Sequence, residues 1–358
     1  MKKKLNKTTK SNLITYAMVV IVYIIVQLLV SGGAVSSLMK GLLVPLCVYS
    51  ILAVSLNLTV GILGELSLGH AGFMCIGAFT SATFSKLTNG VIQPAGFRFF
   101  LAILVGAVFA GIFGLLIGIP VLRLKGDYLA IVTLAFGEII KNLINVLYIG
   151  VDDKGLHVAT SAAGLHLEAG GKQILKGALG ISGTATLYKD IKNYFFLIGV
   201  ILLLLTLFIV QNLVNSRSGR AIMSTRDNRI AAESVGINIT RYKLLAFTIS
   251  AALAGVAGVL YAHNLSLLKV SVFDYNMSIL VLVYVVLGGI GNIRGSIIAT
   301  IILYALPELL RGFANYRMLI YAIVLIIMML FNWAPAARDW RARMVEKFKG
   351  KKAKKEVA

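Results

Sequence analysis

Polar and ionisable side chains within long apolar segments are the residues of this sequence that could do chemistry. Glu138 lies near the middle of the apolar segment 128–149, and Asn142 follows four residues later on the same helix face. A charge at the centre of a bilayer costs at least about 2.5–3.5 kcal/mol, so this face should point toward other helices or a water-filled path. Lys141, three residues after Glu138, could instead pair with it structurally. The sequence leaves both interpretations open.

Two glycine-rich stretches interrupt the apolar segments. Residues 61–72 read GILGELSLGHAG, and residues 288–296 read GGIGNIRGS. Shifted by 227 residues, they share Gly-x-[Leu/Ile]-Gly-[Glu/Asn]-[Leu/Ile], which suggests an internal duplication. Unwound backbone in two such segments can bind a polar solute, although close helix packing through small residues is an alternative. The residues expected to line a translocation path, with Glu138 and Asn142, are Gly64, Ser67, Gly69, His70, Gly288, Gly289, Gly291 and Asn292.

A polar, basic segment, residues 216–243, separates two long apolar regions. Asp227 is expected to cap the start of a short helix, because its carboxylate can accept the free N–H groups of the first turn. Gly236 is expected to end that helix in the left-handed conformation. Such a helix could bind a partner protein in the cytosol, or the segment could be a charged loop that only sets the topology. Its small apolar face consists of Ile230, Ala231, Ala232 and Val235.

The composition is that of a membrane protein. Of the 358 residues, 58% are hydrophobic and 14% charged, and the mean hydropathy is +0.88. Backbone groups in hydrocarbon must be hydrogen-bonded within their own segment or in a closed barrel, and strand-type alternation is absent, so the apolar runs should be helices. The predicted fold is all-α and polytopic, with about ten spans: 13–30, 42–60, 64–86, 99–120, 128–149, 193–213, 244–263, 276–290, 296–312 and 318–333.

The distribution of charge predicts the orientation. Ten spans place both termini on one side, and most of the 35 Lys and Arg residues fall on that side. Because positively charged loops stay in the cytosol, both termini are expected there, in a plasma or inner membrane. The net charge of +21 then reflects topology and anionic lipid, and no nucleic-acid partner is expected. The first apolar run is long for a signal peptide, which favours an uncleaved span and leaves cleavage open.

The predicted organisation follows from the spans and the charged segments. A glycine-rich outer loop within the first membrane half could cap a path, receive an extracellular partner or serve as a spacer. The predicted regions are a basic cytosolic N-terminus (1–12), a first membrane half (13–213) with its outer loop (150–192), a cytosolic loop (214–243), a second membrane half (244–334) and a basic cytosolic tail (335–358).

Catalytic and metal-binding motifs are missing from the sequence. There is no G-x-x-x-x-G-K-[ST] loop for ATP phosphates, no H-E-x-x-H, no paired Cys/His spacing and no G-x-S-x-G elbow. Cys47 and Cys75 both fall inside apolar segments, where neither a disulfide nor a metal site is expected. The sequence therefore predicts a conduit and not an enzyme, with no catalytic residue, metal or cofactor of its own.

Four stretches resemble the permease subunits of high-affinity branched-chain amino-acid ABC importers, specifically the longer of their two permease types. They keep a similar order and spacing over much of residues 56–310, whereas the N-terminal basic segment, the outer loop from about residue 156 and the tail after residue 337 are not matched. The four stretches are residues 64–80 (GELSLGHAGFMCIGAFT), 122–141 (LRLKGDYLAIVTLAFGEIIK), 218–261 and 285–296 (VVLGGIGNIRGS).

This resemblance implies a second permease subunit, two cytosolic ATPases that bind the ATP, and an extracytoplasmic solute-binding protein as partners. It also implies that a helix within residues 226–240 sits in a groove of an ATPase. The residues then expected in this coupling loop are Arg220, Arg226, Asp227, Arg229, Ala232, Glu233, Gly236 and Arg241.

Cargo and energy source remain open at the level of the sequence. The resemblance implies leucine, isoleucine or valine as cargo, while relatives of the family carry urea-like amides or nucleosides. A secondary carrier that couples transport to ions or protons through Glu138 is the competing hypothesis. An intramembrane enzyme is a third, and it has no visible catalytic cluster.

Overall fold

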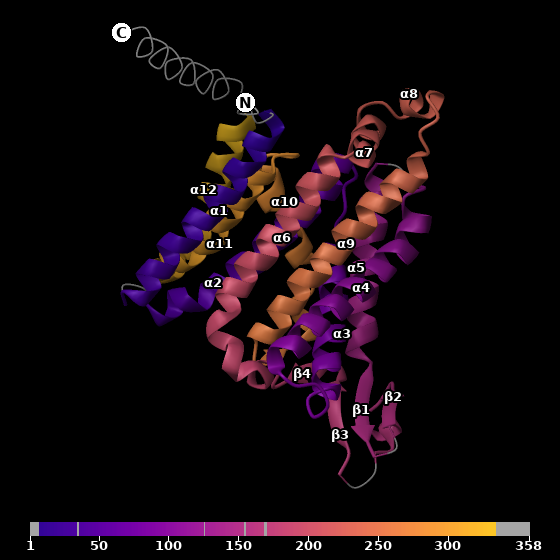
Figure 1. Ribbon diagram of the computed structural model, residues 1–358, viewed down its shortest axis with the longest axis vertical. Helices are drawn as coiled ribbons and strands as arrows, with labels where there is room; N and C mark the ends of the chain where they lie inside the picture. Colours follow the sequence, from indigo (N-terminus) through magenta and orange to yellow (C-terminus); the bar gives the residue numbers. More distant parts are fainter. Residues whose placement is uncertain (1–6, 34–35, 125, 154, 168–169, 334–358) are drawn as a thin grey trace, which may run out of the picture.

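The computed structural model describes residues 7–33, 36–124, 126–153, 155–167 and 170–333. They form a helical bundle with a small sheet at one end (Figure 1). Every apolar segment of the prediction overlaps a helix, which confirms the mostly helical, polytopic fold. These helices are α1 (Lys7–Ser31), α2 (Ser37–Asn57), α3 (His70–Leu87), α4 (Ala95–Val121), α5 (Asp127–Asn145), α6 (Phe195–Asn215), α9 (Ile239–Asn264), α10 (Tyr275–Gly288), α11 (Ile293–Leu309) and α12 (Arg317–Trp333).

Within the described residues, six helical stretches are long and apolar enough to cross a membrane. The helices α10 and α12 are apolar but shorter. The count of ten crossings therefore stays a prediction. The six stretches are Asn12–Ser31, Met39–Leu63, Ala95–Val121, Ala185–Asn215, Ile239–Asn264 and Ile293–Gly312.

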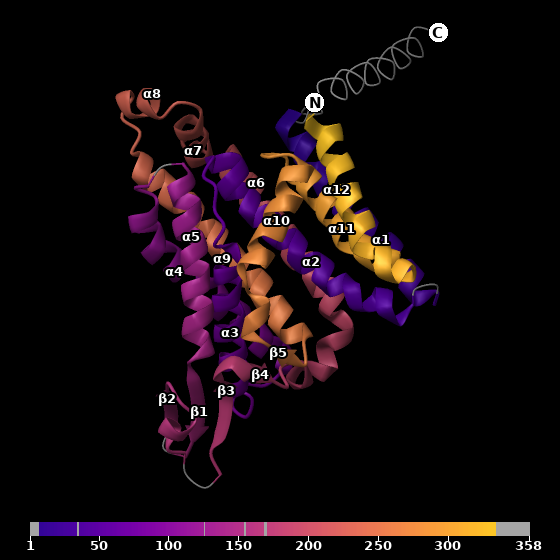
Figure 2. The same cartoon turned by 180° about the vertical axis from the view of Figure 1, so that it is seen from behind.

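Small residues hold α3, α4 and α9 together at the centre of the bundle (Figure 2). A Cβ on Gly77 of α3 would lie 2.3 Å from the carbonyl oxygen of Gly255 in α9. A Cβ on Gly255 would lie 2.7 Å from the carbonyl oxygen of Gly106 in α4. The three backbones thus touch through glycine, as membrane helices do when lipid offers no hydrophobic drive for packing. This contact forms the rigid part of the bundle.

The predicted span 64–86 is wrong at its start. The chain continues from α2 into a short π-helix, η1 (Leu58–Leu63), and then leaves helical structure until α3 begins at His70. Gly64 ends η1 with φ +82°, a left-handed conformation that glycine adopts without a Cβ clash. The glycine-rich stretch therefore forms a true break, which we call the first break (residues 58–69).

The outer loop contains strands that the sequence pattern did not indicate. β1 (Tyr148–Asp152) lies between β2 (Gly155–Ala159) and β3 (Lys172–Lys176) in an antiparallel sheet. β4 (Ile181–Ser182) pairs with β5 (Leu267–Leu268), which ties the loop to the end of α9. The five strands have at most five residues each, too few for a clear period of two. Short helical turns complete the connections: η2 (Ala163–Leu165), η3 (Gly177–Leu179), η4 (Ala185–Tyr194), η5 (Val270–Val272) and η6 (Leu310–Tyr316).

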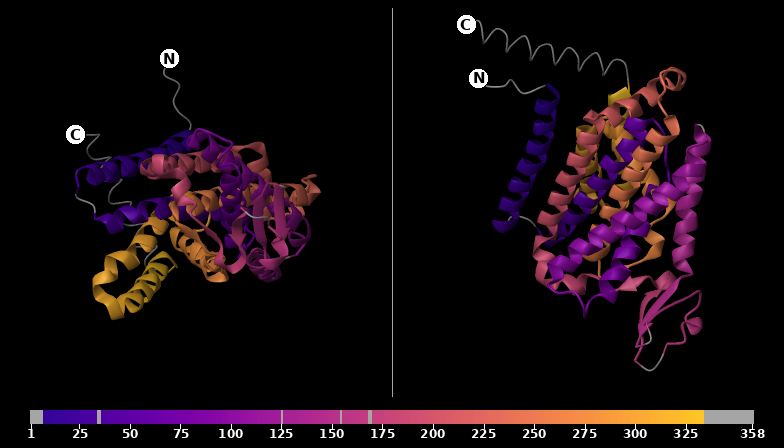
Figure 3. Two further views of the ribbon diagram at one scale, coloured as in Figure 1. Left: turned by 90° about the horizontal axis from the view of Figure 1, so that it is seen from below. Right: turned by 45° about the vertical axis from the view of Figure 1, so that its right-hand side comes forward.

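The sheet and the central polar segment lie at opposite ends of the bundle (Figures 1 and 3). The central segment forms α7 (Arg217–Asp227) and α8 (Arg229–Ser234). The start of α1 and the end of α12 lie at the same end as α7 and α8 (Figures 1 and 2). This arrangement fits an even number of crossings. The predicted tail 335–358 and residues 1–6 of the predicted N-terminal segment lie outside the described residues.

Candidate functional site

The short helix expected between residues 226 and 240 is present in the central loop (residues 216–243) as α8, and a second helix, α7, precedes it. Asp227 is the last residue of α7, and the cap of α8 is Asn228, whose side-chain oxygen accepts the backbone N–H of Ala231 at 3.1 Å. The prediction of Asp227 as the N-cap is therefore wrong by one residue. Asn228 has extended backbone, as an N-cap requires, and it divides the loop into two helices.

Gly236 adopts the predicted left-handed conformation, with φ +83°. Its N–H donates to the carbonyl of Glu233 at 3.0 Å, and the N–H of Ile237 donates to that of Ala232 at 3.1 Å. These bonds satisfy carbonyl groups at the end of α8. No atom lies within 4 Å of a Cβ built on Gly236, so its backbone conformation alone requires glycine there.

The apolar face of α8 is exposed at the tip of the loop. Ile230 is 80% and Val235 is 74% exposed, while Ala232 is buried against the rest of the protein. Arg229 and Glu233 lie one turn apart on α8, with 3.9 Å between Nη2 and Oε1. Exposed apolar side chains rimmed by charge are typical of a surface that binds another protein.

Arg226, at the end of α7, binds the first break. Its Nη1 donates to the carbonyl oxygen of Gly61 at 2.7 Å, and its Nη2 lies 3.0 Å from Oδ1 of Asp227. A Cβ on Gly64 would lie 2.4 Å from Cγ of Arg226, so the arginine stem covers Gly64. The carbonyl groups at a helix end lack intrahelical partners and carry partial negative charge, which a guanidinium group satisfies.

Lys243, at the other end of the central loop, forms an ion pair with Glu65. The two side chains are only 9% and 13% exposed, which makes the pair largely buried. Glu65 follows Gly64 directly, so Arg226, at the end of α7, and Lys243, at the end of the central loop, bind the same five residues of the first break, Gly61–Glu65. We call the contacts of Arg226 and Lys243 with this segment the loop clamp.

Asn57 joins the first break to the second. Its Oδ1 accepts the backbone N–H of Gly291 at 2.9 Å, and its Nδ2 donates to Oγ of Ser296 at 2.8 Å. A Cβ on Gly61 would lie 2.4 Å from the nitrogen of Gly291, so the two backbones touch. Sequence reasoning missed Asn57, although an amide inside an apolar segment is the same kind of signal that singled out Glu138.

The second break is the turn between α10 and α11, residues 289–292, within the glycine-rich stretch 288–296. Gly289 and Gly291 have φ +96° and +81°, and Asn292 caps α11 by accepting the N–H of Gly295 at 3.2 Å. A Cβ on Gly288 would lie 2.5 Å from the carbonyl oxygen of Gly295, which holds α10 against α11. Gly64 and Gly291, equivalent in the 227-residue shift, both adopt the left-handed conformation.

Glu138 has structural partners. It forms the ion pair with Lys141 that was the structural interpretation, and its Oε1 accepts the backbone N–H of Tyr275 at 3.2 Å. That N–H is among the free donors at the start of α10, where a carboxylate is favourable. Asn142 is exposed on α5. The carboxylate of Glu138 therefore fixes α10 against α5.

Ser67, Gly69 and His70, which were also expected on a path, are buried within the protein, whereas Gly64, Gly291 and Asn292 are exposed. Nε2 of His70 lies 2.8 Å from Oγ of Ser55, so a hydroxyl and not a backbone carbonyl is its partner. Gly69 is buried, and a Cβ there would lie 2.3 Å from the carbonyl oxygen of Thr133 in α5. Oγ of Ser67 is buried and has no hydrogen-bond partner among the described residues.

A buried polar network at the sheet end of the bundle escaped sequence reasoning altogether. The hydroxyl of Tyr188 donates to Oγ of Ser85 at 2.8 Å, and Oγ of Ser85 lies 2.8 Å from Nε2 of His263. Nε of Arg98 donates to the Tyr188 hydroxyl at 3.3 Å. These residues come from α4, η4, α3 and α9, so no local pattern could have joined them. They fix the outer connection to the rigid core.

The family model described as the branched-chain amino acid transport system permease component matches residues 38–331. The chain belongs to this permease family. The LivM permease protein of the high-affinity branched-chain amino acid transport system of Salmonella typhimurium is 36% identical over 318 residues, which cover 87% of this chain and 72% of that protein. LivM of Escherichia coli gives the same values. The nucleoside ABC transporter permease NupC of Lactococcus lactis is 25% identical over 57% of this chain and 60% of its own length. No solved structure matches the chain significantly.

The loop clamp predicts a specific pattern of stability. Lys243→Met should lower the free energy of unfolding by about 3 kcal/mol, because it leaves the Glu65 carboxylate buried without its partner. The double variant Lys243→Met/Glu65→Leu should recover most of this loss. Thermal and denaturant unfolding of the purified protein measure both effects.

The pair Arg311–Glu308, at 3.1 Å and more exposed, serves as the control. Arg311→Met should change the free energy of unfolding by less than about 1 kcal/mol. Equal losses for Lys243→Met and Arg311→Met, or no recovery in the double variant, would contradict the clamp.

Proposed function

We propose that this chain is the longer permease subunit of an ATP-driven importer for leucine, isoleucine and valine. The support for this cargo is the similarity to the two LivM proteins, whose names state branched-chain amino acid transport and which this chain matches over 72% of their length. The family of the chain consists of permeases, which supports a conduit, and in this proposal partner subunits hydrolyse the ATP.

The observation that carries the proposed mechanism is the loop clamp. When an ATPase bound to the exposed face of α8 at Ile230 and Val235 moves, that movement needs to pass through only a few residues to reach the bundle. Movement of α8 moves the adjoining ends of α7 and α9, and with them Arg226 and Lys243. These cations pull on Gly61–Glu65, and Asn57 passes the displacement to Gly291.

The two breaks are the parts of the bundle best able to absorb this displacement. Left-handed glycines and a π-helical turn make the backbone of Gly61–Glu65 and of residues 289–292 independent of the regular helix ladder. Helix α3, which follows the first break, packs through glycine against α4 and α9 and moves as a rigid body. The proposal is that shifting these breaks alternates access to a path along the permease, as rigid elements hinge at a few residues.

The proposed assembly contains a second permease subunit, two cytosolic ATPases that bind ATP, and an extracytoplasmic solute-binding protein. The central loop and both termini face the cytosol in this proposal, and the sheet β2-β1-β3 faces the outside, where a binding protein would dock. The proposed regions are those predicted from the sequence: the basic N-terminus (1–12), the first membrane half (13–213), the cytosolic loop (214–243), the second membrane half (244–334) and the basic tail (335–358). A solute passing between the two permeases would meet the breaks at the loop end.

Uptake into proteoliposomes that contain the whole assembly tests the function. Radiolabelled leucine should accumulate only when ATP is supplied to the ATPase side and the binding protein to the other side, and excess valine should compete. Accumulation driven by a proton or sodium gradient without ATP would show a secondary carrier and refute the proposal. Competition by nucleosides and not by valine would keep the ATP-driven mechanism and overturn the cargo.

Gly236→Val should separate ATP hydrolysis from uptake. Valine resists the left-handed conformation at a cost of about 1–3 kcal/mol, so the end of α8 must rearrange while the membrane core is untouched. We expect leucine uptake to fall about tenfold, a loss of about 1.4 kcal/mol in coupling, with ATP hydrolysis retained. Uptake and hydrolysis are measured on the same proteoliposomes.

Gly126→Val is the matched control for backbone strain. Gly126 also has positive φ, +59°, and open space around a built Cβ, but it lies between α4 and α5, outside the central loop. Its replacement should leave the number of leucine molecules imported per ATP unchanged. If Gly236→Val keeps that number as well, α8 is not the coupling element.

A further inference from the structure

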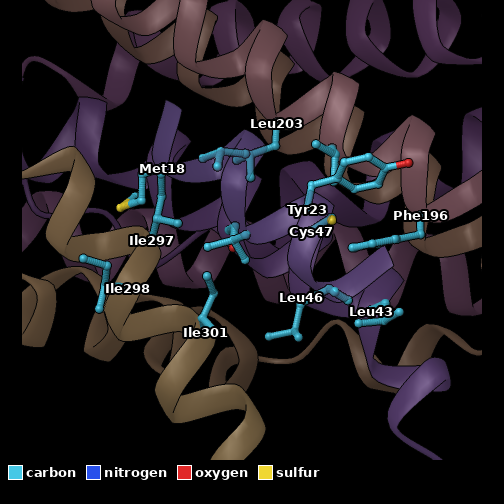
Figure 4. Close-up of a pocket in the computed structure, with 15 residues that line it drawn as sticks. Met18, Tyr23, Leu43, Leu46, Cys47, Phe196, Leu203, Ile297, Ile298 and Ile301 are labelled. Carbon is cyan, nitrogen blue, oxygen red and sulfur yellow. The ribbon is translucent and has the colours of Figure 1, made fainter. Parts of the chain in front are cut away.

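Helix α1 leaves a gap where it meets α6 and α11. Only 11% of its most apolar window is buried, whereas the corresponding window of α2 is 94% buried. Between the three helices and α2 lies an almost entirely apolar cavity of about 150 Å³. Figure 4 shows Met18, Leu203, Ile297, Ile298 and Ile301 around it. A gap of this kind within a membrane is filled by hydrocarbon.

A second, polar pocket of about 260 Å³ lies on the same helices toward the central loop. Arg294, Gln211 and Asn292 line it, together with Asn12, Thr15 and Asn215. The lining contains no carboxylate among the described residues. Unlike the cavity, this pocket offers hydrogen-bonding groups and one positive charge.

The two spaces follow each other along all three helices. On α1 the lining passes from Thr15 to Met18, and on α11 it passes from Arg294 to Ile297, one turn in each case. On α6 it passes from Gln211 to Leu203, two turns away. A polar end at the bundle edge and an apolar continuation into the bundle match the two parts of a phospholipid.

The polar pocket contains two groups that select a headgroup. Arg294 donates from Nε to Oγ1 of Thr15 at 2.6 Å, which orients the guanidinium group beside the pocket, and guanidinium groups fit phosphate well. Gln211 is only 5% exposed, and its Oε1 has no hydrogen-bond partner among the described residues. A buried amide oxygen without a donor is costly, so a ligand that brings a hydroxyl group there would be stabilised.

We propose that this seam between α1, α6 and α11 is a binding site for one phosphatidylglycerol molecule. Arg294 binds its phosphate, Gln211 Oε1 accepts a hydrogen bond from its glycerol headgroup, and one acyl chain fills the cavity beside Ile301. A zwitterionic lipid with an ammonium group would find no carboxylate in the described lining to pair with. An anionic headgroup with a hydroxyl donor is therefore preferred.

The lipid would lie directly against the second break. Gly291 and Asn292 both line the polar pocket, and Gly291 donates its N–H to Asn57. The bound headgroup thus covers the turn that Asn57 connects to the loop clamp. The site offers the membrane a way to stabilise one arrangement of the breaks.

Native mass spectrometry of the delipidated full-length protein, titrated with phosphatidylglycerol or phosphatidylcholine, tests the site. One phosphatidylglycerol should bind about tenfold more tightly than phosphatidylcholine, because both lipids carry the phosphate but only in phosphatidylcholine does a headgroup cation offset its attraction to Arg294. Arg294→Gln should remove this preference, while Arg311→Gln, beyond the other end of α11, should keep it. Equal binding of the two lipids by the unaltered protein, or equal behaviour of the two arginine variants, would overturn the proposal.

Two further variants test the acyl and headgroup contacts. Ile301→Trp fills the cavity and should weaken both lipids, whereas Ile302→Trp, 46% exposed on the outer face of α11, should not. Gln211→Leu should bind phosphatidylglycerol no better than phosphatidylmethanol, which has the same charge and no headgroup hydroxyl. If Ile301→Trp binds lipid like Ile302→Trp, or Gln211→Leu still prefers phosphatidylglycerol, the site is not as described. Melting temperatures close to that of the unaltered protein show that each variant is folded.

Discussion

The backbone of the first break would be unstable without the cations of the central loop. Between the end of η1 and the start of α3 the chain leaves the helix ladder, and carbonyl groups such as that of Gly61 lose their helical partners. Arg226 donates to that carbonyl and Lys243 neutralises Glu65. In a bilayer unsatisfied groups cost several kcal/mol each, so the break and the loop stabilise each other. Neither can change without the other.

Other polar side chains likewise act where the backbone leaves a regular helix. Asn57 satisfies Gly291 and bonds to Ser296, and Glu138 satisfies the start of α10. Helices α3, α4 and α9 meet through glycine, and Ser85 and His263 add a polar contact between α3 and α9. Asn57 and Glu138 thus act where helices begin, end or break, whereas glycine contacts hold α3, α4 and α9 together. A transporter needs both, since displacement must be concentrated at a few places.

The sequence predicted what depends on local chemistry. Each apolar run became a helix, the glycine-rich stretches became breaks, and Gly236 took the left-handed conformation. The error at Asp227 arose because Asn228 caps equally well, and the two residues are adjacent. The partners of Arg226 and Lys243 lie 165 and 178 residues away, so no spacing rule could pair them. The strands of the outer loop were missed because they are too short to show alternation.

The role of the contact between Arg226 and Gly61 is tested most directly with proteoliposomes that carry Arg226→Met. The quantity measured is the number of leucine molecules imported per ATP hydrolysed. Methionine still covers Gly64 but cannot donate to the Gly61 carbonyl, while Arg311→Met, which replaces an exposed arginine outside the central loop, serves as the control. The ratio should fall about tenfold for Arg226→Met, with ATP hydrolysis retained, and should stay unchanged for Arg311→Met. An unchanged ratio in a folded Arg226→Met protein would mean that the loop does not act through the first break.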